Sequence, residues 1–313
     1  MTQSFQNILN NSLTNGSGIL QEAITLLPCA AKEATHFALC HGNKIKYLIE
    51  LDGGIPYLRK TVAPYNTKLT ILLYALPFIP WKILKIARLG FFAKVNLQPT
   101  VAEAVPESHR FNILVGTYDE AQKIVLQCFS KEMKSCTYVK VGNQGSAKQM
   151  EREIDFLRHT PQYKSFSIPK QTSSLLLREG ALFNILITKD FQGERIAPLL
   201  SKELLRITKE IAGEPIEIDG ELYSFSHGDF TPWNVRSNGN NITVFDWEHC
   251  GLRPVGYDAA YFIIMVEIAL HNRSFEEAFK IAQAQINKYD NALQLNYHLI
   301  RLEFAKTTKT LKF

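Results

Sequence analysis

The feature that most constrains the fold is a run of polar residues between apolar segments. Residues 226–235 read SHGDFTPWNV, and residues 242–248 read ITVFDWE. Apolar segments flank the turn-forming residues 237–241, which predicts a β-hairpin that brings Asn234 and Asp246 together at one end. A carboxamide oxygen and a carboxylate meeting there are hard oxygen ligands, the type that Mg²⁺ prefers. The sequence therefore predicts a magnesium site at the end of this hairpin.

The spacing around the hairpin is also informative. Asp229 lies five residues before Asn234, which matches the D-x-x-x-x-N spacing of a kinase catalytic loop. Residues 227–234 and 246–248 resemble the HGD-x-x-x-x-N loop and the D-x-E strand of the aminoglycoside phosphotransferase and choline kinase-like superfamily. The resemblance covers about residues 110–313 and leaves the first hundred or so residues unaccounted for.

The resemblance implies an α+β, bilobal protein-kinase-like fold, with a small antiparallel sheet as N-lobe, a helical C-lobe and ATP between them. The first residues would add an N-terminal α/β segment. By the same resemblance Asp229 is the catalytic base, Asn234 and Asp246 hold Mg²⁺, and His227 braces the loop through hydrogen bonds. The competing interpretation is that these are turn and strand-end residues satisfied by backbone amides. Their combined spacing favours the functional interpretation.

Glu248 has two open interpretations. It lies two residues beyond Asp246, so on a strand both side chains share a face. Glu248 is then either a contact to a metal-bound water or a structural ion-pair partner. The neighbouring His249 and Cys250 do not predict a zinc site, because no second pair with ligand spacing exists.

A phosphotransferase also needs a cation for the nucleotide phosphates. Lys140 is the candidate, because it lies late in a predicted strand among apolar neighbours. Its partner should come from the predicted helix 147–157, where Glu151 and Glu153 compete. Glu153 is about 65° and Glu151 about 95° from the centre of the apolar face, so we choose Glu153. The alternative is that Lys140 is an exposed lysine of an edge strand.

Three further residues are candidates for nucleotide binding. The expected glycine-rich loop is reduced to Gly116 in the segment VGTYD, without a GxGxxG pattern. Residues 187–193 would connect the lobes, with Thr188 and Asp190 beside the adenine edge. The reduced loop supports an alternative function, a catalytically weak kinase-like nucleotide-binding or scaffold protein.

Three parts are expected along the chain. Residues 1–105 form an N-terminal extension with a β-hairpin (His36–Cys40 and Lys44–Glu50) and a basic amphipathic helix at 81–92. Residues 106–190 form the N-lobe, with predicted strands at 111–117, 123–129 and 137–141, the helix at 147–157 and a hairpin spanning 173–187. Residues 191–313 form the C-lobe, with predicted helices at 198–211, 259–270 and 275–287.

Charge is concentrated in the extension. The chain has a net charge of +5. Seven basic residues and no acidic one lie between Gly53 and Ala102, so the rest of the chain is slightly acidic. The uncharged run 69–81 contains two prolines and is too short to cross a bilayer. Residues 69–94 are therefore predicted either to contact an anionic membrane surface or to pack on the kinase-like lobe. Five cysteines without a CxxC pair indicate a cytoplasmic protein, with peripheral contact at the inner face of the membrane as a further expectation.

The function predicted from these features is an ATP- and Mg²⁺-dependent transfer of the γ-phosphoryl group to a small-molecule hydroxyl. The acceptor class includes a sugar, an amino sugar, a glycan or glycolipid precursor, or an amino alcohol. Nucleic-acid binding is not expected, because the basic residues lie among long apolar stretches. No obligate protein partner is indicated.

Overall fold

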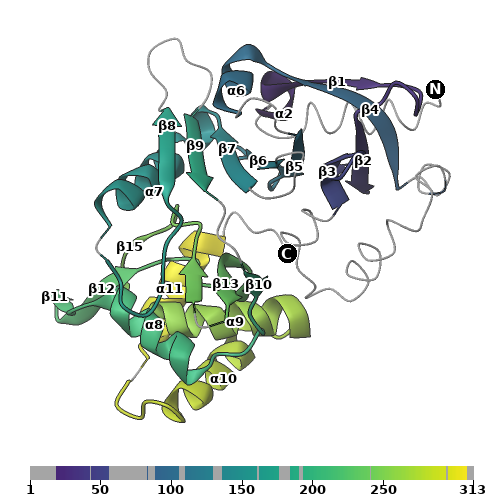
Figure 1. Cartoon of the computed structure of the whole chain (residues 1–313). Coiled ribbons are helices and arrows are strands. Elements are labelled where there is room, and N and C mark those ends of the chain that lie inside the picture. Colours follow the sequence, from purple (N-terminus) through teal and green to yellow (C-terminus); the bar gives the residue numbers. More distant parts are fainter. Residues whose placement is uncertain are drawn as a thin grey trace. The chain divides into compact units, whose positions relative to one another are not determined.

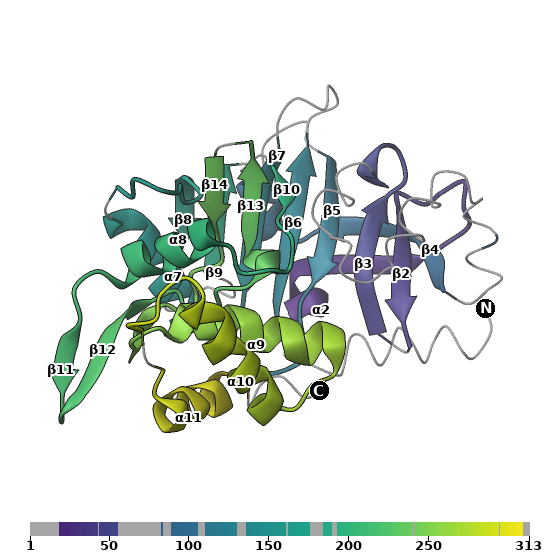
Figure 2. The same cartoon turned by 90° about the horizontal axis from the view of Figure 1, so that it is seen from below.

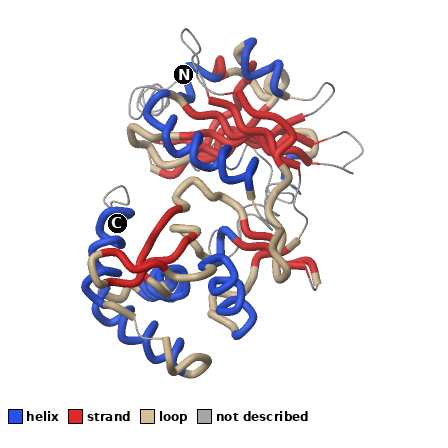
Figure 3. Tube along the Cα trace, turned by 90° about the vertical axis from the view of Figure 1, so that its left-hand side faces the viewer, coloured by secondary structure: helices blue, strands red, loops and turns tan. Residues whose placement is uncertain are grey.

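A computed structural model describes residues 19–42, 44–55, 83, 89–105, 110–129, 136–160, 162–175, 184–189, 193–239, 241–293 and 295–308. The chain divides into two compact units. Unit 1 comprises residues 1–154 and 170–190, and unit 2 comprises residues 155–169 and 191–313. Strands dominate unit 1 and helices dominate unit 2, as strands in red and helices in blue show in Figure 3. The predicted α+β class with a sheet-rich and a helix-rich part is confirmed.

Unit 1 is built on one antiparallel sheet of nine strands in the order β1-β4-β2-β3-β5-β6-β7-β9-β8 (Figure 1). Its strands are β1 (Ile24–Pro28), β2 (His36–His41), β3 (Lys44–Glu50), β4 (Gly90–Leu97), β5 (Arg110–Val115), β6 (Lys123–Phe129), β7 (Cys136–Gly142), β8 (Gln171–Leu175) and β9 (Asn184–Lys189). Its helices are α2 (Ile19–Ala23), α6 (Pro99–Ala104), the 3-10 turn η1 (Gln144–Ser146) and the first part of α7 (Ala147–His159), whose residues from Asp155 onward belong to unit 2. The predicted hairpins β2–β3 and β8–β9 are both present.

The two faces of this sheet differ. On one face Ile113, Leu126 and Val139 lie opposite one another on neighbouring strands, and all three are fully buried. They share a core cluster with residues of α2 and α6, so these two helices cover that face. Side chains alternate along a strand, so Lys140 belongs to the opposite face. The first strands of the chain thus lie in the same sheet as the strands of the predicted N-lobe, as Figure 2 shows for β3 beside β5.

The helix predicted for residues 81–92 is wrong at its C-terminal end. The chain is extended from Gly90 onward and forms β4 there. Phe91 and Phe92 are only 3% and 5% exposed, and the ring of Phe92 meets that of Phe37 edge-on at 5.4 Å. Pairing of aromatic residues across two strands outweighs the helical periodicity that these residues share with the preceding lysines. Residues 81, 82 and 84–88 lie outside the described residues.

Among its described residues, unit 2 contains four whole α-helices, the 3-10 turn η2 (Pro232–Asn234) and two small sheets. The helices are α8 (Lys202–Ala212), α9 (Tyr257–His271), α10 (Phe275–Asn287) and α11 (Tyr297–Thr308). One sheet has the order β10 (Glu194–Arg195), β13 (Val235–Asn238), β14 (Asn241–Val244), and the other β11 (Ile216–Ile218), β12 (Glu221–Ser226), β15 (Gly251–Pro254). α8 begins later than predicted because the side chain of Ser201 caps it by accepting from the Leu204 N–H.

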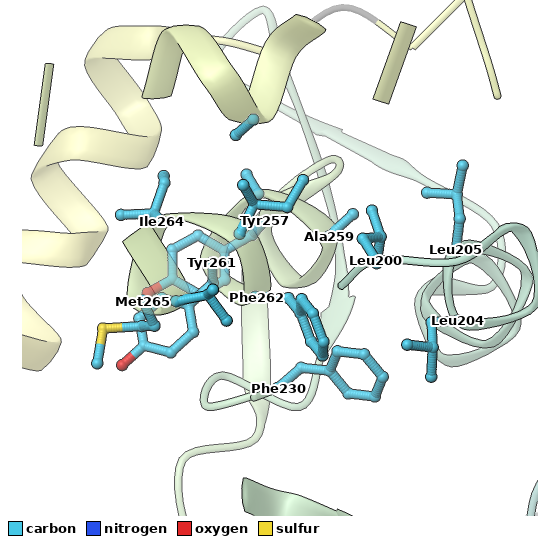
Figure 4. Packing of buried hydrophobic residues seen from close by; sticks show 14 of the residues in the cluster. Leu200, Leu204, Leu205, Phe230, Tyr257, Ala259, Tyr261, Phe262, Ile264 and Met265 are labelled. Atoms are coloured by element: carbon cyan, nitrogen blue, oxygen red, sulfur yellow. The ribbon is translucent and has the colours of Figure 1, made fainter. Parts of the chain in front are cut away.

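The core of unit 2 forms around α9, which is apolar on all sides and buried along its first eleven residues. Figure 4 shows its Phe262 beside Phe230, which immediately follows Asp229 in the chain. The centres of the two rings are 5.9 Å apart. Trp247 is fully buried and stacks on Phe156 at 4.1 Å. Phe230 and Trp247, the residues that directly follow Asp229 and Asp246, are therefore both packed in the main core of this unit.

Candidate active site

The β13–β14 hairpin has the predicted geometry. Val235 pairs with Val244 and Asn238 with Asn241, so the turn is short and the strands are in register. Beyond the last pair, the Phe245 N–H donates to the Asn234 carbonyl at 3.1 Å. Asn234 and the residues leading into Asp246 therefore leave the hairpin side by side, as the sequence predicted.

Asp229 and Asn234 are in direct contact. The Nδ2 group of Asn234 donates to the Asp229 carboxylate at 2.8 Å and to the Asp229 carbonyl at 2.9 Å. Burial raises the pKa of Asp229 to about 7, the neighbouring His249 opposes this shift, and the charge of Asp246 adds to it. Because Asn234 uses its nitrogen on Asp229, its Oδ1 atom is left to bind a cation. A cation nearby would stabilise the Asp229 carboxylate.

His227 connects this loop to the hairpin. Its Nδ1 atom accepts from the Asp229 N–H at 3.2 Å, so the proton of the neutral ring is on Nε2, which donates to the Phe245 carbonyl at 3.0 Å. Burial lowers the pKa of His227. A neutral imidazole of fixed tautomer thus links the residue before Asp246 to the backbone of Asp229, which is the geometry that a bracing role requires.

The loop is also held from the start of α9. One Asp258 oxygen accepts from the Ser226 hydroxyl at 2.7 Å and the Gly228 N–H at 3.1 Å, and the other accepts from the His227 N–H at 2.8 Å. Asp258 lies in the first turn of α9 and is 4% exposed. A carboxylate in that position is favoured by the helix dipole, and it satisfies backbone donors that would otherwise be buried without a partner.

Two residues of this site have left-handed backbone conformations. Gly228 has φ +83°, and a β-carbon there would lie 2.1 Å from the His249 carbonyl oxygen, so only glycine fits. Asp246 has φ +69°, which is uncommon for a residue with a side chain. Strain of this kind persists where the surroundings fix the conformation, and it is concentrated at functional sites.

Glu248 and His249 follow Asp246. Glu248 is 8% exposed, and its Oε1 atom is 3.5 Å from Nε2 of His249. Burial lowers the pKa of His249, whereas the hydrogen bond and charge of Glu248 and the charges of Asp229 and Asp246 raise it, and the net shift is upward. The contact with His249 agrees with the interpretation of Glu248 as a structural ion-pair partner. The burial of the Glu248 carboxylate agrees equally with a contact to a metal-bound water.

In unit 1, Lys140 and Glu153 form an ion pair. Their Nζ and Oε2 atoms are 2.6 Å apart, and the side chains are 16% and 6% exposed. Lys140 lies on β7, which is paired on both sides by β6 and β9, so the alternative of an edge-strand lysine is wrong. Glu151 is exposed to solvent on the other side of α7. The structure thus pairs Lys140 with the glutamate chosen from the helical periodicity.

The remaining nucleotide candidates are placed individually. Gly116 follows β5, and its N–H donates to the Lys123 carbonyl at 2.9 Å, which closes the β5–β6 turn. Thr188 lies on β9 opposite Tyr138 and is 9% exposed. Asp190 lies outside the described residues.

Tyr261 was missed by the sequence analysis. It is 1% exposed on α9 and stacks on Tyr257, one turn earlier, at 5.4 Å. Burial raises the pKa of Tyr261, and its interactions with the Asp229 carboxylate raise it further. Only the fold reveals this neighbour, because a tyrosine in an apolar helix resembles any other core residue.

A family model described as the phosphotransferase enzyme family matches residues 222–291. That stretch contains the loop from Ser226 to Asn234, the β13–β14 hairpin, Asp246 and Asp258. The resemblance to the aminoglycoside phosphotransferase and choline kinase-like superfamily is confirmed over these residues.

Two solved structures show weaker similarity. One is an amicoumacin kinase, hAmiN, in complex with AMP-PNP, Ca²⁺ and Ami, at 13% identity over 66% of this chain and 82% of that chain, with a TM-score of 0.42. The other is a protein from Haemophilus somnus 129PT described as a fructosamine-3-kinase, at 12% identity over 61% of this chain and 88% of that chain, with a TM-score of 0.33. No curated protein matches the chain.

Proposed function

We propose that this chain, whose residues 222–291 carry a segment of the phosphotransferase enzyme family, transfers the γ-phosphoryl group of ATP to a small-molecule hydroxyl. The observation that carries the proposal is the Asp229–Asn234 contact. One carboxamide holds a carboxylate through its nitrogen at 2.8 Å and keeps its oxygen for a cation. Phosphoryl transfer by kinases uses a catalytic aspartate and a metal-binding asparagine of this kind, on one loop.

Bound MgATP would supply the phosphoryl group and the charge that neutralises the phosphate oxygens. Asn234 Oδ1 and the Asp246 carboxylate would hold the metal, with Glu248 as a further ligand or a contact to a metal-bound water. The Lys140 ammonium, kept in place by Glu153, would bind the nucleotide phosphates, and Gly116, Thr188 and Asp190 would lie along the nucleotide.

Asp229 would accept the proton of the acceptor hydroxyl while the oxygen of that hydroxyl forms a bond to the γ-phosphorus. The bond from the γ-phosphorus to the bridging oxygen then breaks, and ADP leaves. His227 and Asp258 fix the backbone of the loop, so the carboxylate is already oriented before the acceptor binds.

The acceptor is a small molecule with a free hydroxyl, of the sugar, amino sugar, glycan or glycolipid precursor, or amino alcohol classes. A panel with members of each class, incubated with MgATP, should give ADP release above the acceptor-free rate for at least one class. Asp229→Asn should remove that increment. An increment that persists in Asp229→Asn would contradict the assignment of the base.

A second candidate function is a nucleotide-binding module of low catalytic activity. The lone Gly116 in the β5–β6 turn favours it, because the sequence has no further glycine between Gly116 and β6. Binding of MgATP without ADP release by any acceptor in the panel would support this candidate.

Contact of residues 69–94 with an anionic membrane surface stays a prediction. The ring of Phe92 is buried against Phe37 and is therefore not exposed for insertion into a membrane. The basic residues of this segment still favour the contact, because each one near an anionic surface contributes about 1 kcal/mol to the binding free energy. Among the described residues, no helix is long and apolar enough to span a membrane. Sedimentation with anionic vesicles at low and high salt tests the contact.

A further inference from the structure

The β5–β6 turn, residues 116–122, is the segment that stands where a glycine-rich loop is expected. Tyr118 in this turn donates its hydroxyl to the Ile45 carbonyl on β3 at 2.7 Å, and its ring packs against the core cluster that includes Ile45. Both partners of this bond are far apart in sequence, and Ile45 belongs to the hairpin β2–β3 of the N-terminal extension. The extension therefore holds the turn directly.

Two lysines of the same hairpin lie against the same ring. The Nζ atoms of Lys44 and Lys46 are 5.0 and 6.0 Å from the centre of the Tyr118 ring. Burial lowers the pKa of Lys46, and the charge of Lys44 lowers it further. These cation–π contacts add to the hydroxyl bond and restrict the ring from the hairpin side.

The turn is also fixed from inside and from its other side. The Asp119 carboxylate accepts from the Ala121 N–H at 3.0 Å, and the Asp119 carbonyl accepts from the Gln122 N–H at 3.2 Å. A β-carbon at Gly145, at the 3-10 turn η1, would lie 1.9 Å from the Glu120 carbonyl oxygen. The turn is thus packed between the β2–β3 hairpin and η1.

The hairpin itself is firmly attached to β5. The backbone register between β3 and β5 contains only the pairs Tyr47–Leu114 and Leu48–Ile113. Side chains add further hydrogen bonds between β5 and this part of the chain. The Asn112 side chain accepts from the Glu50 N–H at 3.0 Å and donates to the Gly54 carbonyl at 2.8 Å. His36 Nε2 donates to the Phe111 carbonyl at 2.9 Å. An anchor of this kind can hold a turn in place.

We propose that the β2–β3 hairpin of the N-terminal extension fixes the β5–β6 turn as a preordered cover for the nucleotide phosphates, through Tyr118. A glycine-rich loop is mobile and is ordered when the nucleotide binds. A turn that is already ordered avoids that entropic cost. Tyr118 is a positioning residue that acts through the turn, and the inference rests on the proposed function.

The test is Tyr118→Phe, which keeps the ring and its contacts with the lysines but removes the bond to Ile45. The KM for MgATP should rise about fivefold while kcat stays within about twofold, because the turn contributes to nucleotide binding and not to the chemical step. Amide hydrogens of residues 117–122 should exchange about tenfold faster, without a change in β6 or β7.

Thr35→Val is the matched control, since it removes a hydroxyl at the other end of β2. The Thr35 hydroxyl donates to His36 Nδ1 at 2.8 Å and accepts from the Val95 N–H at 3.0 Å. This variant should lower the melting temperature and leave the KM for MgATP and the exchange of the turn unchanged. A purely structural role for Tyr118 predicts that both variants behave alike.

Equal KM values and equal exchange for Tyr118→Phe and the unmodified chain would overturn the inference alone. Failure of the unmodified chain to bind MgATP would overturn the proposed function and this inference with it. Because binding by the unmodified chain is measured first, the two failures are distinguishable.

Discussion

The two units hold their candidate functional side chains in different ways. In unit 1, Lys140 and Glu153 project from a regular strand and a regular helix, and one contact of 2.6 Å joins them. In unit 2, Asp229 follows the left-handed Gly228 and Asp246 is itself left-handed. This irregular backbone is held by buried hydrogen bonds that involve His227 and Asp258. Regular secondary structure orients the first pair, whereas tertiary contacts with irregular backbone orient the second.

The comparison predicts that backbone changes are most damaging in unit 2. Gly228→Ala should lower the free energy of unfolding by about 3 kcal/mol and abolish activity, because the new β-carbon meets a carbonyl oxygen at 2.1 Å. Gly220→Ala, in the β11–β12 turn, is the control. It has a similar φ, +80°, but no neighbour within 4 Å, so it should cost only about 1 kcal/mol.

Urea denaturation of both variants, with activity measured in parallel, checks this prediction. Similar losses for the two glycines would show that the close approach of the loop to residue 249 has no energetic importance. The distinction between regular and irregular supports would then be wrong.

A smaller effect is expected when the regular pair is broken. Lys140→Ala and Glu153→Ala should each reduce turnover at the same step, and the double variant should be little worse than either. In unfolding, the coupling energy of the pair should be about 2 kcal/mol, because either single change removes a short contact between two largely buried charges.

A double-mutant cycle with Glu151→Ala as control measures this coupling. Glu151 is exposed on the same helix and should not couple to Lys140. Additive losses for Lys140 and Glu153, or a larger effect at Glu151, would reject the pairing as a functional unit.

The smallest effect concerns a buried group in the regular unit. His36 is 3% exposed, and burial lowers its pKa from 6.5 to about 4. Between these values the unfolded chain binds more protons than the folded chain, so stability falls as the pH decreases below 6.5 and this loss is complete below about 4. At pH 5.5 the loss from this group should be about 1.4 kcal/mol relative to pH 7.5.

His36→Gln removes the titrating group, and Gln can still donate to the Phe111 carbonyl. Its unfolding free energy should therefore change less between pH 7.5 and 5.5 than that of the unmodified chain, by about that amount. An identical pH dependence in both proteins would show that His36 is not the group responsible.

The difference between the units also explains what the sequence could predict. The β2–β3 hairpin, the strands β5 to β7, α7 and the choice of Glu153 follow from alternation and helical periodicity, since these elements are regular. The β13–β14 hairpin followed from its turn residues. The Asp229–Asn234 spacing identified the loop, but no periodicity could supply the bonds to Asp258 that fix it.

The failures have a common cause. Phe91 and Phe92 fitted a helical pattern locally, yet they pair with Phe37 and Ala38, which are more than fifty residues away. The continuation of the sheet into the first strands of the chain and the contact of Tyr261 with Asp229 likewise depend on neighbours distant in sequence. Local patterns do not contain that information.

The central claim is that the Asp229 carboxylate is the base of a MgATP-dependent phosphoryl transfer. The most direct measurement compares the unmodified chain with Asp229→Asn, using an acceptor found in the panel. We predict that the acceptor-dependent rate of ADP release falls at least about 100-fold, while MgATP affinity stays within about twofold, because the base does not hold the nucleotide. A variant that keeps its rate, or loses MgATP binding in proportion to activity, would contradict the account.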